Sequence, residues 1–483
     1  MIRRPGSSNL LRRLTSFVIT FALTFCITRP SWGYSVLTHE AIIDAEWDDQ
    51  IKPLLLERFP NATVEQLREA RAYAYGGCII QDMGYYPFGS RFFSHLTHYV
   101  RSGDFVQALF EESRDLNDYA FALGAFSHYV ADIQGHSLAV NRSVPLLYPR
   151  LREKYGDWMT WEESPWAHSL TEFGFDTLEV VAGHVAPQKY HDWIGFKVAE
   201  PPLRRAFRRT YGLELSDQIL SVRLALASYR ESASQVIPEM TEVAWALRRK
   251  ELEGRTSEKY HEQLYHLSRK SYEAWRKTYT RPGVGDKLTA FVFRLIPKFG
   301  PLNVINFHTP TRVTEQLFAD SLRATVASYD KALREAAATG FDPPNVNLDT
   351  GRPTRPGEYA ASDRTYAELL HKLKHDRFAG VSPALRNNLL DFYSNSTDDT
   401  MRKNHRRWRG VLRDRDELKA TFALPEAHPI TSTSACASTC DPLSTSNPCP
   451  PQVSLVESLP GIGILEALFL NQKCYPWKLR GAL

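Results

Sequence analysis

Apolar residues recur at helical spacing through most of the chain, and runs of strict alternation between apolar and polar residues are scarce. The pattern predicts helices at 41–59, 64–75, 105–112, 119–136, 216–250, 258–279, 312–337, 364–375 and 382–393. Prolines and glycines interrupt it at 282–286, 297–301 and 342–356, which we interpret as connectors. The fold class that follows is all-α, with many helices joined by long loops.

The first thirty or so residues have the layout of an export signal. Arg3, Arg4, Arg12 and Arg13 precede an apolar run from Phe17 to Ile27. This run is shorter than the ~20 residues that a membrane-spanning helix needs, so a cleaved signal peptide at 1–31 is favoured over a single-span anchor. Cleavage after Gly33 is the alternative to cleavage after Ser31. We therefore expect a secreted or periplasmic protein.

Composition narrows the class of protein further. With 43% hydrophobic and 24% charged residues in 483, the chain is of ordinary globular type and excludes a disordered or multi-span membrane protein. The net charge of +4 is too small to imply a nucleic-acid binder. Four cysteines, Cys436, Cys440, Cys449 and Cys474, lie in the last fifty residues. In an exported protein they favour two disulfides over a zinc knuckle, for which no CxxC pair is present.

Histidines and carboxylates are spaced as metal ligands in two short motifs. His128, Asp132 and His136 are four residues apart, so on a helix they lie on one face. Backbone rise puts His128 about 12 Å from His136, too far to share an ion whose ligand bonds are about 2 Å long. This motif predicts two metal ions with Asp132 between them. The pair His168 and Glu172 is common enough to arise by chance when taken alone.

These motifs belong to a longer series that resembles the zinc-dependent phospholipase C family, above all its branch related to glycosylphosphatidylinositol-specific phospholipase D. The resemblance runs from Trp32 to Phe196. It rests on residues in the family's order: Trp32, His39 in Thr38-His39-Glu40, Asp82 in a Gly/Tyr-rich loop, His98 before Tyr99, and the two motifs above. It implies an all-α domain that holds three zinc ions and hydrolyses phosphodiesters. Single-strand-specific secreted nucleases share that fold and cluster.

The resemblance also implies a set of ligands. One zinc ion would be held by Asp82, His98, His128 and Asp132, and a second by His136, His168 and Glu172. A third would be held by His39, Asp132 and Trp32, the last through a free amino group and its carbonyl. His95 is the alternative to His98, which we prefer because Tyr99 then completes a His-aromatic pair. Since the third ion depends on Trp32 being the mature N-terminus, we expect two or three zinc ions per chain.

The function implied is that of a secreted zinc-dependent phosphodiesterase that hydrolyses phospholipids, with a phospholipid or membrane surface as substrate. A metal-activated water would be the nucleophile, and Asp82 would act as base or water-orienting group. One alternative is a single-strand nuclease of the same fold, with nucleic acid as substrate. Another is a non-catalytic zinc-binding protein at a lipid surface, in which helices after Ser216 cover the cleft.

The same interpretation divides the chain after the signal peptide into three parts. A zinc-dependent phospholipase C-like catalytic domain is predicted at 32–250. A helical extension packed on it follows at 251–424, and a Ser/Thr/Pro/Cys-rich tail follows at 425–483.

Overall fold

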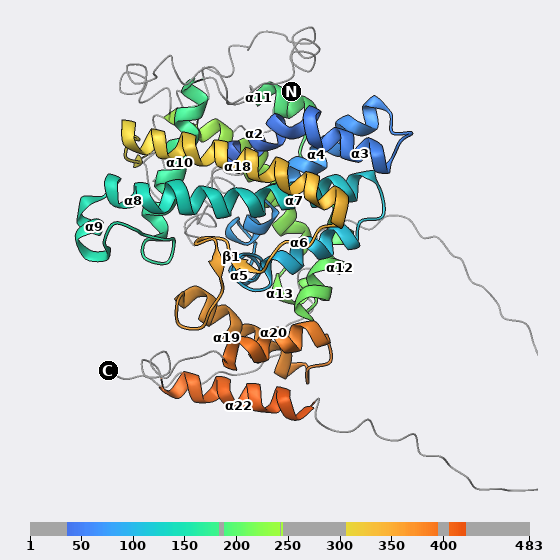
Figure 1. Ribbon diagram of the computed structural model, residues 1–483, viewed down its shortest axis with the longest axis vertical. Coiled ribbons are helices and arrows are strands. Elements are labelled where there is room, and N and C mark those ends of the chain that lie inside the picture. The colour runs from blue at the N-terminus through green and yellow to red at the C-terminus, as the bar shows by residue number, and fades with distance from the viewer. Residues whose placement is uncertain (1–35, 183–187, 242, 245–305, 395–404, 422–483) are drawn as a thin grey trace, which may run out of the picture. The chain divides into compact units, whose positions relative to one another are not determined.

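The computed structural model describes residues 36–182, 188–241, 243–244, 306–394 and 405–421, all within one compact unit, Met1–Pro425. Helices make up nearly all of the regular structure in these ranges (Figure 1). The strands described are β1 (Val346–Asn347) and β2 (Arg352–Pro353), which pair antiparallel with Val346 opposite Pro353. The predicted all-α class is therefore confirmed.

The described helices form two groups along the sequence, and the second begins at residue 312. The first group comprises α2 (Val36–Glu46), the π-helical η1 (Trp47–Ile51), α3 (Lys52–Arg58), α4 (Val64–Gly77), the 3-10 helix η2 (Ile80–Tyr85), α5 (Arg91–Tyr99), α6 (Ser102–Glu111), α7 (Leu116–Gly135), the π-helical η3 (His136–Val140), α8 (Asn141–Leu147), α9 (Pro149–Tyr155), α10 (Pro165–Ala182), α11 (Gln188–Ile194), α12 (Glu200–Tyr211), α13 (Leu215–Gln218), α14 (Val222–Glu231) and the π-helical η4 (Ser232–Val236). The second comprises α18 (Arg312–Thr339), α19 (Ala360–His375), α20 (Pro383–Ser394) and α22 (His405–Thr421).

The segment 216–250, predicted as one helix, is divided where the structure describes it. The chain is extended at Ile219, which ends α13, and the Ser221 side chain accepts a hydrogen bond from the Leu224 amide to begin α14. A serine side chain at this point can cap the first turn of a new helix, and this competes with continuing the previous helix. The predicted signal peptide, the predicted helix at 258–279, the predicted connectors at 282–286 and 297–301 and the four cysteines near the end of the chain lie outside the described residues.

Helix α7 lies at the centre of the fold, and α4 crosses it at very short range. A side chain on Gly77 would meet the Phe121 carbonyl oxygen at 2.1 Å, and one on Gly124 would meet the Ala74 carbonyl oxygen at 2.1 Å. Glycine at both positions lets the two backbones touch. This contact places η2, which follows α4 and contains Asp82, directly beside α7.

Helix α18 packs along α7 from a distant part of the sequence (Figure 1). A capping box at Thr311 begins it, and the Tyr329 hydroxyl donates to the Leu123 carbonyl at 2.8 Å. The residues after position 306 therefore share a core with the N-terminal helices. Within the described ranges, no helix is both long and apolar enough to cross a bilayer.

Candidate metal centre

Several helices deliver the predicted ligands to one place in the core. Each of the eight described ligands is at most 2% exposed. They come from α2 (His39), η2 (Asp82), α5 (His98), α7 (His128 and Asp132), η3 (His136) and α10 (His168 and Glu172). The ninth predicted ligand, Trp32, lies outside the described residues.

Asp132 is the centre of this cluster. Its Oδ2 lies 3.2 Å from His128 Nε2 and 3.3 Å from His98 Nε2. Its Oδ1 faces the other way, 3.5 Å from His39 Nε2 and 4.0 Å from His136 Nε2. The two oxygens of one carboxylate thus face different histidines, which is the arrangement that a bridging ligand requires.

The ligand atoms form three groups, in each of which they lie within 4.8 Å of one another. The groups are His39, His128 and Asp132; Asp82, His98 and His128; and His136, His168 and Glu172. The last is the predicted second zinc site, with Glu172 Oε1 2.8 Å from His168 Nε2 and 3.4 Å from His136 Nε2. The first two groups share His128, so these two candidate metal sites are adjacent.

Polar atoms in the cluster lack the hydrogen bonds that burial demands. Within the described part of the chain, neither oxygen of Asp132 or Glu172 and neither ring nitrogen of His168 has a hydrogen-bond partner of acceptable geometry. Each such buried group costs about 1–3 kcal/mol unless something else satisfies it. A cation satisfies them together, and imidazole nitrogen with carboxylate oxygen is a donor set that suits zinc.

Oxygens on the far side of two rings select the tautomer that a metal needs. His98 Nδ1 lies 2.7 Å from the Ser94 carbonyl oxygen, and His128 Nδ1 lies 3.1 Å from the Cys78 carbonyl oxygen. A carbonyl only accepts, so Nδ1 carries a proton and Nε2 is the nitrogen left to bind an ion. The fold thus aims both histidines as metal ligands before any ion binds.

The comparisons with known proteins bear on this arrangement. The family model of zinc dependent phospholipase C matches residues 38–219. This part of the chain is similar to the zinc-dependent phospholipase C family. The matched range includes all eight described ligands of the cluster. Searches of the curated proteins and of the solved structures gave no match.

The charges within the cluster around Asp132 depend strongly on one another. Burial alone would lower the pKa of His98, but the carboxylates of Asp132 and Asp82 outweigh it and raise that pKa to about 10. Burial would raise the pKa of Asp132, but His128 and His136 hold it well below its usual range. Without an ion, the cluster therefore keeps protons that it must lose to a metal, above all at His98 and His136. Zinc binding displaces those protons, so affinity falls as the pH falls.

His95, the alternative to His98, lies outside the three groups. It packs in an aromatic cluster, with its ring 5.7 Å from Trp161 and 6.1 Å from Tyr85. Burial lowers the pKa of His95 to about 4. The geometry therefore favours His98 as the partner of Asp82, with Nε2 3.3 Å from Asp82 Oδ1.

A second buried network, which the sequence analysis missed, fixes helix α2 and so His39. The Asp44 carboxylate accepts hydrogen bonds from Arg71 and Tyr75 on α4 and lies 3.2 Å from His191 Nε2 on α11. His191 Nδ1 is also 2.8 Å from Glu40 Oε2. Burial alone would lower the pKa of His191, but the carboxylates of Glu40 and Asp44 outweigh it and raise that pKa to about 10. No short motif joins these residues, so only the fold reveals them.

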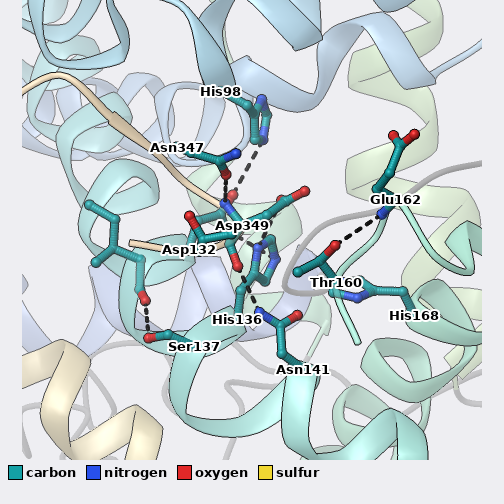
Figure 2. Close-up of polar contacts among 12 residues, drawn as sticks. His98, Asp132, His136, Ser137, Asn141, Thr160, Glu162, His168, Asn347 and Asp349 are labelled. Carbon is teal, nitrogen blue, oxygen red and sulfur yellow. Dashed lines mark hydrogen bonds and ion pairs between the residues drawn. The ribbon is translucent and has the colours of Figure 1, made fainter. Parts of the chain in front are cut away.

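Asp349 is a further buried carboxylate that the sequence analysis did not single out. It belongs to the segment 342–356, which connects α18 to α19 as predicted but also reaches the metal centre (Figure 2). Its Oδ1 lies 3.1 Å from His136 Nδ1. Burial would raise the pKa of Asp349, but His136 lowers it to about 2. The available signal was the alternation of Val346, Asn347, Leu348 and Asp349 inside an otherwise polar stretch.

Proposed function

We propose that this protein is a zinc-dependent phosphodiesterase that hydrolyses phospholipids by phospholipase C chemistry. The observation that carries the proposal is the cluster around Asp132, in which the ligands of a multi-zinc centre converge inside a region matched by the zinc dependent phospholipase C family. The coarser conclusion, a zinc-dependent hydrolase of phospholipid type, rests on that family. The substrate and the number of ions belong to the proposal.

The residues of the cluster have distinct roles in such a reaction. Bound zinc would supply a nucleophilic water near neutral pH and neutralise charge on the phosphoryl oxygens. Asp132 holds two sides of the centre together through its two oxygens. Asp82 Oδ1 is buried and has no hydrogen-bond partner among the described residues, so its carboxylate can orient the attacking water and accept its proton. The nearly complete burial of the ligands keeps these charges in a low-dielectric setting, where they interact strongly.

We further propose that the chain is exported and that its mature form begins at Trp32. The support is the arginine-rich start and apolar run of the first thirty or so residues, together with the position of His39 beside Asp132. A free amine at Trp32, with an ordinary pKa near ~8, would add a ligand that an amide nitrogen does not provide. A third ion therefore depends on where the signal is cut.

We expect more than one zinc ion per chain. His128 and His136 face different oxygens of Asp132, and His136, His168 and Glu172 form a group of their own. One ion cannot satisfy both sides of the cluster with bonds of about 2 Å. Elemental analysis of purified full-length protein should give two zinc ions, or three when the N-terminus is Trp32. A content near one per chain after exhaustive metal loading would contradict this.

The substrate is tested with phosphatidylcholine vesicles. We expect zinc-loaded protein to release phosphocholine and diacylglycerol, and a chelator to abolish the release, because every proposed step needs the metal centre. The variant His168→Ala should lose the activity, since it removes a ligand. The matched control His375→Ala should keep it, because that histidine is on α19 and exposed.

The products distinguish the alternatives. Release of choline with phosphatidic acid would show cleavage on the other side of the phosphate. Cleavage of single-stranded DNA with phosphatidylcholine left intact would replace the proposal by a nuclease of the same fold. Zinc binding with neither activity would favour the non-catalytic alternative.

A further inference from the structure

The turn that contains Asp349 is hydrogen-bonded directly to helices of the metal centre. The Leu348 amide donates to the carbonyl of His98 at 3.0 Å, and the Asn141 side chain donates to the carbonyl of Asp349 at 2.7 Å. The Asp349 amide donates to Asn347 Oδ1 at 2.9 Å, which closes the turn. These contacts join the turn to α5 on one side and to α8 on the other, with Asp349 between them (Figure 2).

The Asp349 carboxylate, like the backbone of its turn, is fixed by hydrogen bonds. It is 2% exposed. Its Oδ2 accepts hydrogen bonds from the hydroxyls of Tyr99, at 3.0 Å, and Tyr359. Its Oδ1 is left to face His136 Nδ1 at 3.1 Å (Figure 2). Two tyrosines thus orient the carboxylate, and the carboxylate points at the ring of one ligand.

The geometry points to Asp349 as the residue that positions His136 for zinc. A carboxylate at this distance stabilises a proton on Nδ1, so Nε2, which is directed at Glu172 and Asp132, is the nitrogen left to bind an ion. For His98 and His128 the corresponding acceptor is a backbone carbonyl. Among these three histidines, His136 alone has a charged group beside its Nδ1 in the described structure, and a charged partner there makes the imidazole a stronger ligand.

This assignment extends the centre beyond the part of the chain that matches the family. The matched range ends at residue 219, and Asp349 comes after it, on the turn between α18 and α19. The C-terminal helices therefore do more than cover the N-terminal ones, because the turn between two of them supplies a functional carboxylate. The inference rests on the proposed zinc centre and names which part of it Asp349 serves.

The test compares zinc affinity in full-length, zinc-loaded variants by competition with a chromogenic chelator. In Asp349→Asn, the amide no longer stabilises the Nδ1 proton by charge and can donate to Nδ1 itself, which favours the wrong tautomer. We expect the affinity for one ion, that of the His136 group, to fall about 10–100-fold, while the remaining zinc is held as in the unchanged protein. A loss confined to one ion is a readout that general destabilisation does not produce.

Two further variants make the test selective. Tyr359→Phe keeps the carboxylate and removes one of the hydrogen bonds that orient it, so we expect a smaller loss of affinity at the same ion. Asp363→Asn is the matched control, because that carboxylate lies nearby in the sequence and accepts hydrogen bonds from the Gly357 amide, at 2.9 and 3.1 Å. Its zinc affinity should equal that of the unchanged protein.

The outcomes separate this inference from the proposed function. Zinc binding by Asp349→Asn that matches the unchanged protein at every ion would overturn the inference. If Asp349→Asn does not fold, unchanged affinity in Tyr359→Phe overturns it, and weaker binding at one ion supports it. Selective loss of one ion in a protein that hydrolyses no phospholipid would support the inference and refute the substrate proposal alone.

Discussion

Replacing Asp132 by asparagine is expected to abolish both hydrolysis and most of the zinc binding. The two Asp132 oxygens face four histidines, and an amide offers one neutral oxygen in their place. Loss of a partner outside the ligand set commonly costs 10–100-fold, so losing a bridging ligand should cost more than about 100-fold in activity. The measurement is zinc content together with the rate of phosphocholine release.

Glu172→Gln is the matched comparison for this result. Glu172 lies near His136 and His168 on one side of the centre, so its loss should release one ion and leave the other. Equal losses of activity and of zinc in the two variants would show that Asp132 does not bridge.

Asp44→Ala is expected to destabilise the folded protein by about 3–5 kcal/mol, because it leaves a buried guanidinium without its carboxylate. Arg71 is 3% exposed, and its guanidinium carbon lies 5.2 Å from the ring centres of both Trp47 and Tyr190. These rings favour a cation but do not replace a negative charge. Urea-induced unfolding followed by circular dichroism measures the change in free energy.

Glu335→Ala controls for the loss of a carboxylate from an ion pair. Glu335 lies 3.7 Å from Lys331 on α18, and both side chains are more than half exposed. Such a pair contributes about 0.5 kcal/mol or less. If Asp44→Ala were no more destabilising than this control, the network around α2 would have no structural role.

The central part of the site could be predicted because its residues are close in sequence. His128, Asp132 and His136 share one face of a helix, and the spacing alone indicates that they act together. The structure adds that His136 is the first residue of a π-helical segment, η3, at the end of α7. Local geometry of this kind depends on packing against α8, α10 and α18, which the pattern of one helix does not contain.

The rest of the site depends on contacts between distant segments. Asp349 lies in a stretch rich in proline and glycine, where composition favours a connector, and no spacing rule relates it to His136. Asp44, Arg71 and His191 come from three helices and meet only when α2, α4 and α11 pack. A buried carboxylate in a polar segment looks like any surface aspartate until its neighbours are known.

The contacts between the N-terminal helices and the segment after residue 306 also set an order of events during synthesis. The Tyr329 hydroxyl binds the Leu123 carbonyl, and Asp349 binds Tyr99 and Asn141. A nascent chain that has emerged only as far as residue 219 carries all eight described ligands but still exposes the face of α7 that α18 covers. Contacts of such long sequence separation form slowly, because a large loop must close first. The cluster around Asp132 therefore acquires its last buried neighbours, α18 and the turn with Asp349, only after most of the chain has been made.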